Sequence, residues 1–154
     1  MRQAVMTAPG EITFREIEQP IPGADQALVR IHRIGVCGSD IHVFHGKHPY
    51  TTYPIVQGHE VSGIVAAVGN AVEGLSVGTQ VTFMPQVTCG ECYPCRHGMH
   101  HICESLQVMG FQTDGAGQDY FAVDADQILP LPEEIPLDWA AMIEPISVGV
   151  HALE

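Results

Sequence analysis

Four of the five cysteines in this 154-residue chain fall in one run, CGECYPCRHGMHHIC, at positions 89–103. They are Cys89, Cys92, Cys95 and Cys103, and their pattern is C-x2-C-x2-C-x7-C. Two-residue gaps allow thiolates on a tight turn to converge on one ion, and coordination by four cysteines is typical of a closed structural zinc site. The spacing therefore favours a zinc ion in this loop.

Iron–sulfur ligation is the main alternative for this run, because bacterial ferredoxins use C-x2-C-x2-C-x3-C-P. Here the last gap is longer, and Glu104 rather than proline follows the final cysteine. The short gaps and the odd cysteine count disfavour disulfides, and free thiols are the remaining alternative. We interpret His97, His100 and His101 as solvated loop residues, because four sulfurs already satisfy an ion.

A second set of ligand-type side chains is spread more widely along the chain, and its members are Cys37, His59, Glu60 and Glu144. One thiolate, one imidazole and one or two carboxylates are enough for an open zinc site, which keeps a position for water or substrate. Each residue taken alone has an ordinary alternative, such as a small buried cysteine, a strand-end histidine or a charge at a helix end. The residues alone leave both interpretations open.

Strands are the main elements that must position these side chains. Alternating or β-branched runs predict strands at 11–18, 27–36, 59–70, 79–84, 118–123 and 126–130. Short strands separated by turn residues indicate a sandwich or a barrel. The pattern becomes helical over 137–154, with Pro136 at the start and a break at Glu144-Pro145, since a residue before proline avoids the α region. The chain ends inside the second predicted helix, so we expect a larger protein.

Composition restricts the class of partner. A net charge of -12 with only six Lys and Arg residues disfavours nucleic acid and membrane partners, because both require concentrated positive charge. No run resembles a signal peptide or reaches the length of a transmembrane helix. We therefore expect a cytoplasmic protein, in which clustered cysteines hold metal more often than they form disulfides.

The motifs together resemble the zinc-dependent medium-chain dehydrogenases, and specifically their N-terminal GroES-like catalytic domain. The family pattern G-H-E-x-x-G-x-V-x-x-V-G matches residues 58–69, and C-G-x-D-x-H matches residues 37–42. The sorbitol or polyol branch carries E-P-x-S-V-x-x-H-A, which matches residues 144–152. Animal sorbitol dehydrogenases lack the cysteines found at 89–103, so bacterial relatives are more similar. Gly117 departs from the family, which usually has an aromatic residue there.

This resemblance implies a mainly β fold. The expected architecture is a GroES-like partly open β-barrel with a structural-zinc loop and C-terminal helices that lead to a Rossmann domain absent from this chain. It places the catalytic domain at 1–136 and the start of the nucleotide-binding domain at 137–154. It also implies two zinc ions, one catalytic and one structural, and NAD or NADP bound in a longer parent protein. We expect that parent to be a homo-oligomer.

The resemblance also assigns the ligands of the catalytic zinc. It makes Cys37 and His59 ligands and leaves Glu60 and Glu144 as rivals for the third position. Consecutive side chains on an extended strand point apart, so Glu60 can join His59 only if the backbone turns. We favour Glu60 as the ligand, as in the polyol branch, with Glu144 orienting a water.

Two further residues receive roles in proton transfer by resemblance. Ser39 takes the proton of the substrate, and His42 passes it towards solvent. The alternative for His42 is a surface histidine on a strand. Four residues of the following loop either wall the substrate cleft or only pack: Phe44, His45, His48 and Tyr50.

The expected activity is oxidation of a small-molecule polyol, sugar acid or other secondary alcohol. Zinc bound to the substrate oxygen lowers its pKa and stabilises the alkoxide, and a hydride passes to NAD or NADP. We expect this chain alone to be inactive, because it contains no G-x-G-x-x-G turn for a dinucleotide. The alternatives are a non-catalytic zinc-stapled β-barrel that serves as a binding module, and an enzyme similar to threonine dehydrogenase.

Overall fold

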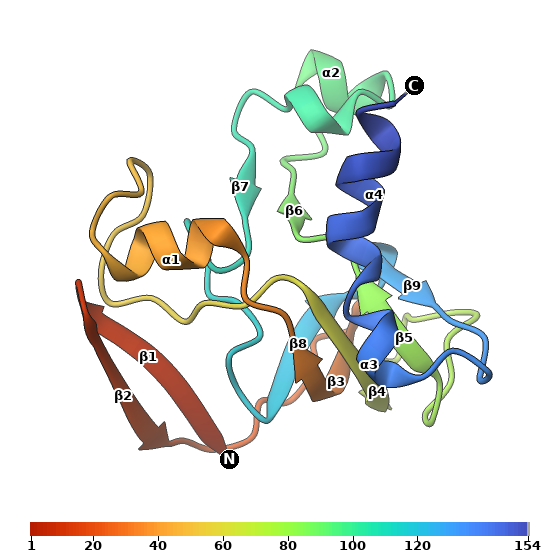
Figure 1. Cartoon of the computed structure of the whole chain (residues 1–154). Coiled ribbons are helices and arrows are strands. Elements are labelled where there is room, and N and C mark those ends of the chain that lie inside the picture. Colours follow the sequence, from red (N-terminus) through yellow and green to blue (C-terminus); the bar gives the residue numbers. More distant parts are fainter. Residues whose placement is uncertain (154) are drawn as a thin grey trace.

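The computed structural model describes residues 1–153, and strands predominate in it (Figure 1). The strands are β1 (Arg2–Ala8), β2 (Glu11–Glu16), β3 (Gln26–Ile34), β4 (Val61–Val68), β5 (Gln80–Phe83), β6 (Gln86–Val87), β7 (Gln107–Val108), β8 (Tyr120–Asp124) and β9 (Ile128–Pro130). The helices are α1 (Gly38–Phe44), α2 (Tyr93–Arg96), α3 (Leu137–Ala140) and α4 (Ile143–His151). Two short 3-10 helices are η1 (His100–Ile102) and η2 (Ala125–Gln127).

One antiparallel sheet forms the body of the chain, with strand order β8-β3-β4-β5-β9. Its two end strands do not pair with each other, so the sheet is not a closed barrel. β-Branched residues on its inner face fill the core, among them Val29, Val61 and Val81. At Gly63 a Cβ atom would lie 2.6 Å from the carbonyl oxygen of Arg30, so only glycine allows β3 and β4 to approach here. The predicted mainly β, partly open GroES-like fold is confirmed.

The six predicted strands are present with shifted ends, but three further strands escaped prediction. β1 and β2 form a separate hairpin that meets the body of the chain through bridges such as Met6 with Ile55. The pattern of β1 is irregular, because Val5 and Met6 are both buried and the register shifts after Met6. β6 and β7 have two residues each, which is too short for a periodicity to be read.

The helical segment at the C-terminal end differs from the prediction in where it breaks. α3 ends at Ala140 and α4 begins at Ile143, so the break precedes Glu144-Pro145. Pro145 lies in the first turn of α4, where a missing N–H costs little because that turn has no intrahelical acceptor for it. The end of the predicted segment, Glu154, lies outside the described residues. No helix in residues 1–153 has the length and apolar character needed to cross a membrane.

α3 packs on the main sheet, and this contact fixes where α4 starts. Ser62 of β4 donates its hydroxyl to the carbonyl oxygen of Leu137 at 2.7 Å, and Ala140 is fully buried. The domain boundary at residue 136 stays a prediction. The contact nevertheless ties residues 137–141 to the strands that precede them.

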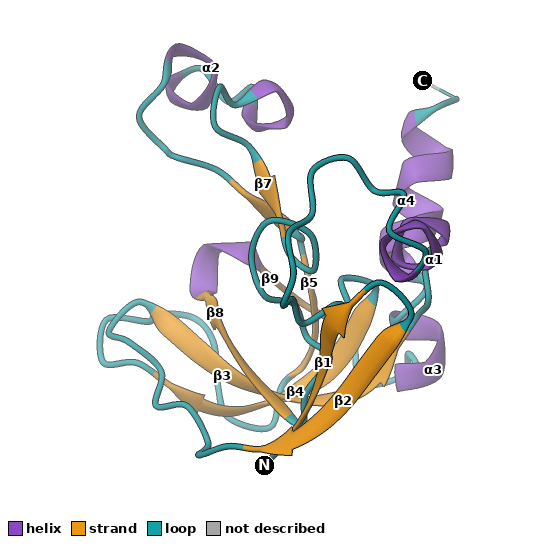
Figure 2. Ribbon diagram, turned by 90° about the vertical axis from the view of Figure 1, so that its left-hand side faces the viewer, coloured by secondary structure: helices purple, strands orange, loops and turns teal. Residues whose placement is uncertain are grey.

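Residues 86–108, from β6 to β7, form a projection that we name the cysteine lobe. Figures 1 and 2 show the β6–β7 hairpin leading away from the main sheet to the loops around α2 and η1. Large apolar side chains of the lobe such as Tyr93 and Ile102 are more than half exposed, whereas Cys95 and Cys103 are buried. The buried residues of the lobe are therefore two cysteines and Pro94, with no large apolar side chain among them.

Candidate metal centres

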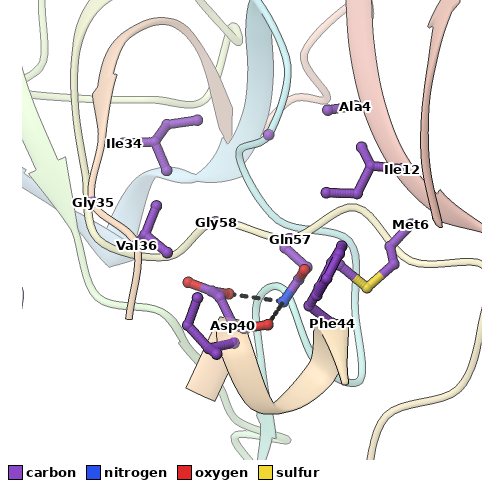
Figure 3. A pocket seen from close by; sticks show the side chains of 12 residues that line it. Ala4, Met6, Ile12, Ile34, Gly35, Val36, Asp40, Phe44, Gln57 and Gly58 are labelled. Carbon is purple, nitrogen blue, oxygen red and sulfur yellow. Dashed lines mark hydrogen bonds between the residues drawn. The ribbon is translucent and has the colours of Figure 1, made fainter. Parts of the chain in front are cut away.

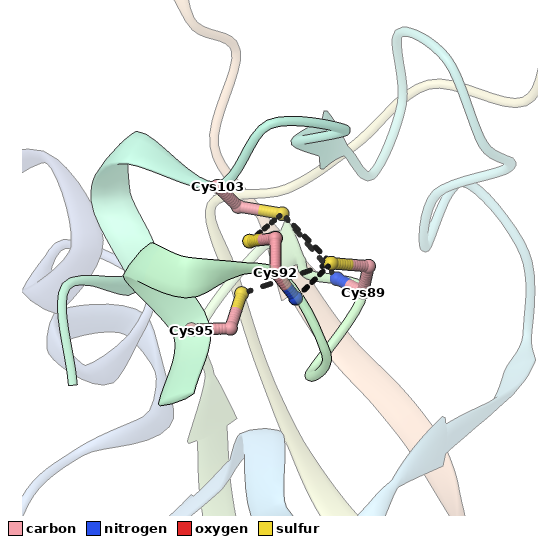
Figure 4. Close-up of side chains that lie close together, drawn as sticks. All are labelled: Cys89, Cys92, Cys95 and Cys103. Atoms are coloured by element: carbon pink, nitrogen blue, oxygen red, sulfur yellow. Dashed lines mark hydrogen bonds between the residues drawn. The ribbon is translucent and has the colours of Figure 1, made fainter. Parts of the chain in front are cut away.

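The four sulfurs of the cysteine lobe converge on one point (Figure 4). The Sγ–Sγ distances are 3.9 Å for Cys89–Cys95, 3.9 Å for Cys92–Cys103 and 3.6 Å for Cys89–Cys103. Four sulfurs arranged tetrahedrally at about 2.3 Å from a zinc ion are about 3.8 Å apart, whereas disulfide sulfurs are about 2.05 Å apart. The geometry therefore fits a tetrahedral ion and excludes disulfides among these cysteines.

Backbone amides of the lobe stabilise negative charge on two of the sulfurs. The N–H groups of Cys89 and Cys92 donate to the Sγ atoms of Cys103 and Cys89, each at 3.4 Å. The Cys92 N–H is the main cause that lowers the pKa of Cys89 to about 6. Burial raises the pKa of Cys95 to about 12, so this thiol requires a cation to ionise near neutral pH. Metal binding supplies that cation.

A second group of ligand atoms gathers between α1 and the start of β4. The side-chain donor atoms of Cys37, His59 and Glu60 all lie within 4.8 Å of one another, and His59 and Glu60 are buried. The backbone bends at Glu60, immediately before β4 begins, so this side chain can join its neighbour His59. The turn that the sequence analysis required for a Glu60 ligand is present.

Glu144 lies outside this cluster but close enough to influence it. It is half-buried in the first turn of α4. Burial raises the pKa of Glu144, the nearby His59 lowers it, and the negative charge of Glu60 raises it again. The charges of Glu60 and Glu144 therefore influence each other. Only Glu60 lies with Cys37 and His59 in the cluster of ligand atoms.

The chemistry of the donor set fits a divalent ion. Thiolate, imidazole and carboxylate are the usual zinc ligands. Nδ1 of His59 is buried and has no hydrogen-bond partner within residues 1–153. The nearest carboxylate oxygen, Oδ1 of Asp40, is 3.8 Å from this nitrogen. A histidine that ligates a metal through one ring nitrogen usually directs the other at a carboxylate, and this arrangement approaches that pattern.

Asp40 itself was not assigned a role from the sequence. It is the third residue of α1, and its Oδ2 accepts the N–H of Cys37 at 2.9 Å, which secures the start of the helix. Burial is the main cause that raises its pKa, and the charge of His59 and two hydrogen bonds oppose that rise. The carboxyl of Asp40 thus connects the segment of one ligand to the ring of another.

Ser39 and His42 both lie on α1, a helix that the strand pattern did not predict. They are three residues apart and so lie on the same side of the helix, with Ser39 half-buried and His42 exposed. The alternative of a surface histidine on a strand was wrong about the strand, but His42 does lie at the surface. The sequence did carry a signal for this helix, because an acidic residue in the first turn precedes Ile41 and Phe44, which are spaced for one face.

The loop after α1 meets the open site through an aromatic residue that the sequence analysis missed. His48 stacks on Phe111 with ring centroids 4.7 Å apart, and Phe111 leans on His59 with centroids 4.9 Å apart. His48 is half-buried, whereas His45 and Tyr50 are exposed. Of the four residues assigned to this loop from the sequence, Phe44 is in fact the last residue of α1, and His48 reaches the site through Phe111.

Gly35 is required for the observed position of Glu60. Its N–H donates to the Glu60 carbonyl oxygen at 2.7 Å, and a Cβ atom there would lie 2.2 Å from Oε2 and 2.9 Å from Cβ of Glu60. We expect Gly35→Ala to displace Glu60 and to weaken Zn²⁺ binding at the open site by about 10-fold or more, the scale of changes next to metal ligands. Competition with a chromophoric chelator measures this. Gly38→Ala is the control, since a Cβ there meets no atom within 4 Å, and equal weakening in both variants would contradict the explanation.

The sequence matches a known protein family over most of its length. Residues 23–133 match the family described as "Alcohol dehydrogenase GroES-like domain". The chain belongs to this family. The resemblance stated from the motifs is therefore confirmed.

Several curated relatives of this GroES-like chain are named dehydrogenases. L-galactonate-5-dehydrogenase of Escherichia coli K12 is 37% identical over 153 residues, which cover 99% of this chain and 45% of that protein. Sorbitol dehydrogenase of Bacillus subtilis is 35% identical over 156 residues, with coverages of 99% and 44%. L-threonine 3-dehydrogenase of Pyrococcus furiosus is 35% identical over 141 residues, with coverages of 90% and 40%. The chain spans less than half the length of each relative.

Solved structures show the same fold at similar identity. Galactitol-1-phosphate dehydrogenase from Escherichia coli matches with a TM-score of 0.92 and 35% identity, over 99% of this chain and 44% of that chain. RspB from Escherichia coli CFT073, described as a short chain alcohol dehydrogenase complexed with the cofactor NADH, matches with a TM-score of 0.89 and 37% identity. That match covers 97% of this chain and 44% of the other.

Proposed function

We propose that this chain is the metal-binding catalytic portion of a zinc-dependent dehydrogenase that oxidises a polyol, a sugar acid or another secondary alcohol with NAD or NADP. The observation that carries the proposal is the cluster of Cys37, His59 and Glu60. A closed four-cysteine site has no free position for chemistry, and a purely structural module has no need of a second, open site.

The residues of the open site have distinct proposed tasks. Cys37, His59 and Glu60 hold a zinc ion, which when bound makes the hydroxyl group of a substrate easier to deprotonate. Ser39 accepts the hydroxyl proton as it passes its own hydroxyl proton on towards His42. His42 releases a proton to solvent, since it is exposed on the same side of α1. The four cysteines of the lobe hold the second zinc ion and take no part in the reaction.

The names of the relatives support the substrate class and the hydride acceptor. Galactonate, sorbitol and galactitol 1-phosphate are carbon chains with several hydroxyl groups, and one relative was solved with NADH. The acceptor must be held about 3–3.5 Å from the reacting carbon. We therefore propose that a longer parent protein supplies the cofactor domain.

We expect the parent protein carried past Glu154 to reduce NAD or NADP with at least one substrate of this class, and the 154-residue chain to reduce neither. The measurement is nicotinamide absorbance with a panel of sugar alcohols, sugar acids and L-threonine. Cys37→Ser in the parent is the matched variant and should abolish turnover.

Two results would contradict this proposal. Activity of the 154-residue chain alone would show that no further domain is required. Inactivity of the parent on every substrate tried, with both metal sites filled, would favour a binding module instead. Turnover of L-threonine alone, whose hydroxyl group is also a secondary alcohol, would keep the proposed dehydrogenase and narrow its substrate to an amino acid instead of a polyol or sugar acid.

A further inference from the structure

One polar side chain beside the open metal site has no part in the proposed chemistry. Gln57 lies two residues before His59, and Figure 3 shows its amide directed at Asp40. Its Nε2 donates to the Asp40 carboxylate oxygen Oδ1 at 3.0 Å and to the Asp40 carbonyl oxygen at 3.3 Å. The side chain of Gln57 therefore contacts both the carboxylate and the backbone carbonyl group of Asp40.

Asp40 is the group through which Gln57 reaches two metal ligands. Oδ2 of Asp40 accepts the N–H of Cys37 at 2.9 Å, and Oδ1, the oxygen that Gln57 contacts, lies 3.8 Å from Nδ1 of His59. The Asp40 side chain is only 10% exposed, so water does not compete freely for its carboxylate. Its orientation is set by the N–H of Cys37 on one oxygen and the amide of Gln57 on the other.

Backbone hydrogen bonds hold the segment that carries Gln57 in place. The carbonyl oxygens of Val56, Gln57 and Gly58 accept the N–H groups of residues 115–117 at 2.7, 2.7 and 2.8 Å. A Cβ atom at Gly115 would lie 2.4 Å from the Gly58 carbonyl oxygen, which shows how closely the two segments approach. The backbone entropy at Gln57 is therefore already lost, and only the rotamer freedom of its side chain opposes the hydrogen bond to Asp40.

The surroundings of Gln57 argue against a role in packing alone. It lines a cavity of about 240 Å³ whose other walls are largely apolar, including Met6, Ile34 and Phe44 (Figure 3). A polar amide beside such walls costs free energy unless it is hydrogen-bonded, so a leucine or methionine would serve packing better. The hydrogen bonds to Asp40 therefore account for an amide at this position.

We propose that Gln57 is a positioning residue that orients the Asp40 carboxylate between Cys37 and His59, so that the thiolate and the imidazole are preset for one ion. The inference rests on the proposed function only in that these two residues bind a metal. It adds a residue outside the ligand set that acts on the ligands only through Asp40.

The test measures metal affinity rather than turnover. A mild chelator first empties the open site of the chain, and metal analysis checks that one zinc per chain stays in the four-cysteine site. Co²⁺ is then titrated into the wild type and into Gln57→Met, which keeps the length of the side chain and removes both donors. We expect affinity to fall by about 10–100-fold, the range for groups that orient a metal ligand, and the visible bands of bound Co²⁺ to shift.

Gln26→Met is the matched control, because Gln26 also donates Nε2 to an aspartate, Asp124 Oδ1 at 2.9 Å, on the β3–β8 edge of the sheet. It should leave the Co²⁺ affinity and spectrum unchanged. Gln57→Glu places a second carboxylate against Asp40 and should lose at least as much affinity as Gln57→Met. Adding Asp40→Asn to Gln57→Glu exchanges the two groups, so that residue 40 supplies the amide donor and residue 57 the carboxylate. This double variant should recover part of the Co²⁺ affinity that Gln57→Glu loses.

Each result decides between the explanations. If the wild type binds no Co²⁺ at the open site, the proposed function fails and the inference fails with it. If the wild type binds and Gln57→Met binds within twofold of it with the same spectrum, the inference alone is overturned. If Gln57→Met loses the retained zinc or unfolds, and the Asp40→Asn addition restores nothing to Gln57→Glu, then Gln57 maintains the fold in general and the inference is overturned.

Discussion

Cys92→Ser is expected to release the metal of the cysteine lobe and to open the lobe, while the main sheet stays folded. The lobe has little else to hold it, because Tyr93 and Ile102 are largely exposed and its buried centre contains Cys95 and Cys103. Metal-binding free energy in small zinc domains is on the order of 10 kcal/mol and acts directly as folding free energy. Removing one of four ligands therefore takes away the main force that closes these loops.

The expected size of the effect differs between the lobe and the whole chain. Protease cleavage within residues 86–108 should become at least about 10-fold faster, since cleavage follows the population of the open form. If about 2–3 kcal/mol of the loss reaches global unfolding, the melting temperature falls by about 5–10 °C. Metal analysis should give two zinc ions for the wild type and one for Cys92→Ser.

Cys37→Ser is the matched control, since it removes one cysteine ligand from the other site. It should also leave one zinc ion, but protease cleavage of the lobe should be unchanged. The opposite pattern, with melting caused by Cys37→Ser and none by Cys92→Ser, would reverse the roles of the two sites. If metal analysis finds iron instead of zinc in the cysteine lobe of the wild type, the iron–sulfur alternative holds for this site.

The parts of the fold that the sequence predicted are those whose signals are local. The four cysteines lie within one turn-rich run, so their spacing alone indicates a common ion. The strands of the main sheet carry runs of β-branched and aliphatic residues. In β3 burial alternates over residues 29–32, where Val29 is buried and Arg30 is exposed, and Ala27 and Leu28 before them are buried in succession. Local patterns of this kind survive folding because packing reinforces them.

The parts that escaped prediction depend on contacts between distant segments. α1 is one helix of seven residues, and much of its support comes from Asp40 and the segment that carries Gln57. The bend that brings Glu60 to His59 depends on the room left by Gly35, twenty-five positions earlier in the chain. No window of sequence contains both partners, so residue spacing left the choice between Glu60 and Glu144 open.

Glu60→Gln is expected to weaken Zn²⁺ binding at the open site far more than Glu144→Gln. Both changes keep the size of the side chain and remove its charge. A carboxylate oxygen of Glu60 lies within 4.8 Å of the Cys37 sulfur and of a ring nitrogen of His59, and Glu144 is not a member of that cluster. Since changes to groups that only orient a ligand already cost about 10–100-fold in affinity, loss of a ligand should cost at least about 100-fold.

The charge balance at the site is a second reason to expect a larger loss of Zn²⁺ affinity in Glu60→Gln than in Glu144→Gln. A thiolate from Cys37 and a carboxylate from Glu60 neutralise a dication, with His59 neutral. Glu144 would add a third negative charge next to Glu60. Burial is the main cause of the raised pKa of Glu144, and repulsion by Glu60 adds to it. Removing the charge of Glu144 therefore relieves a repulsion while it removes an attraction to the ion, and the net loss should be about 10-fold or less.

Competition of each variant with a chromophoric chelator at pH 7 measures the two affinities, with zinc held in the cysteine lobe as the internal control for folding. A larger loss in Glu144→Gln than in Glu60→Gln would make Glu144 the third ligand. In that case Glu60 would be the carboxylate that orients the water, and Gly35→Ala would lose its predicted effect on the metal, because that effect acts only through Glu60. The two experiments therefore test one assignment from opposite sides of the same contact.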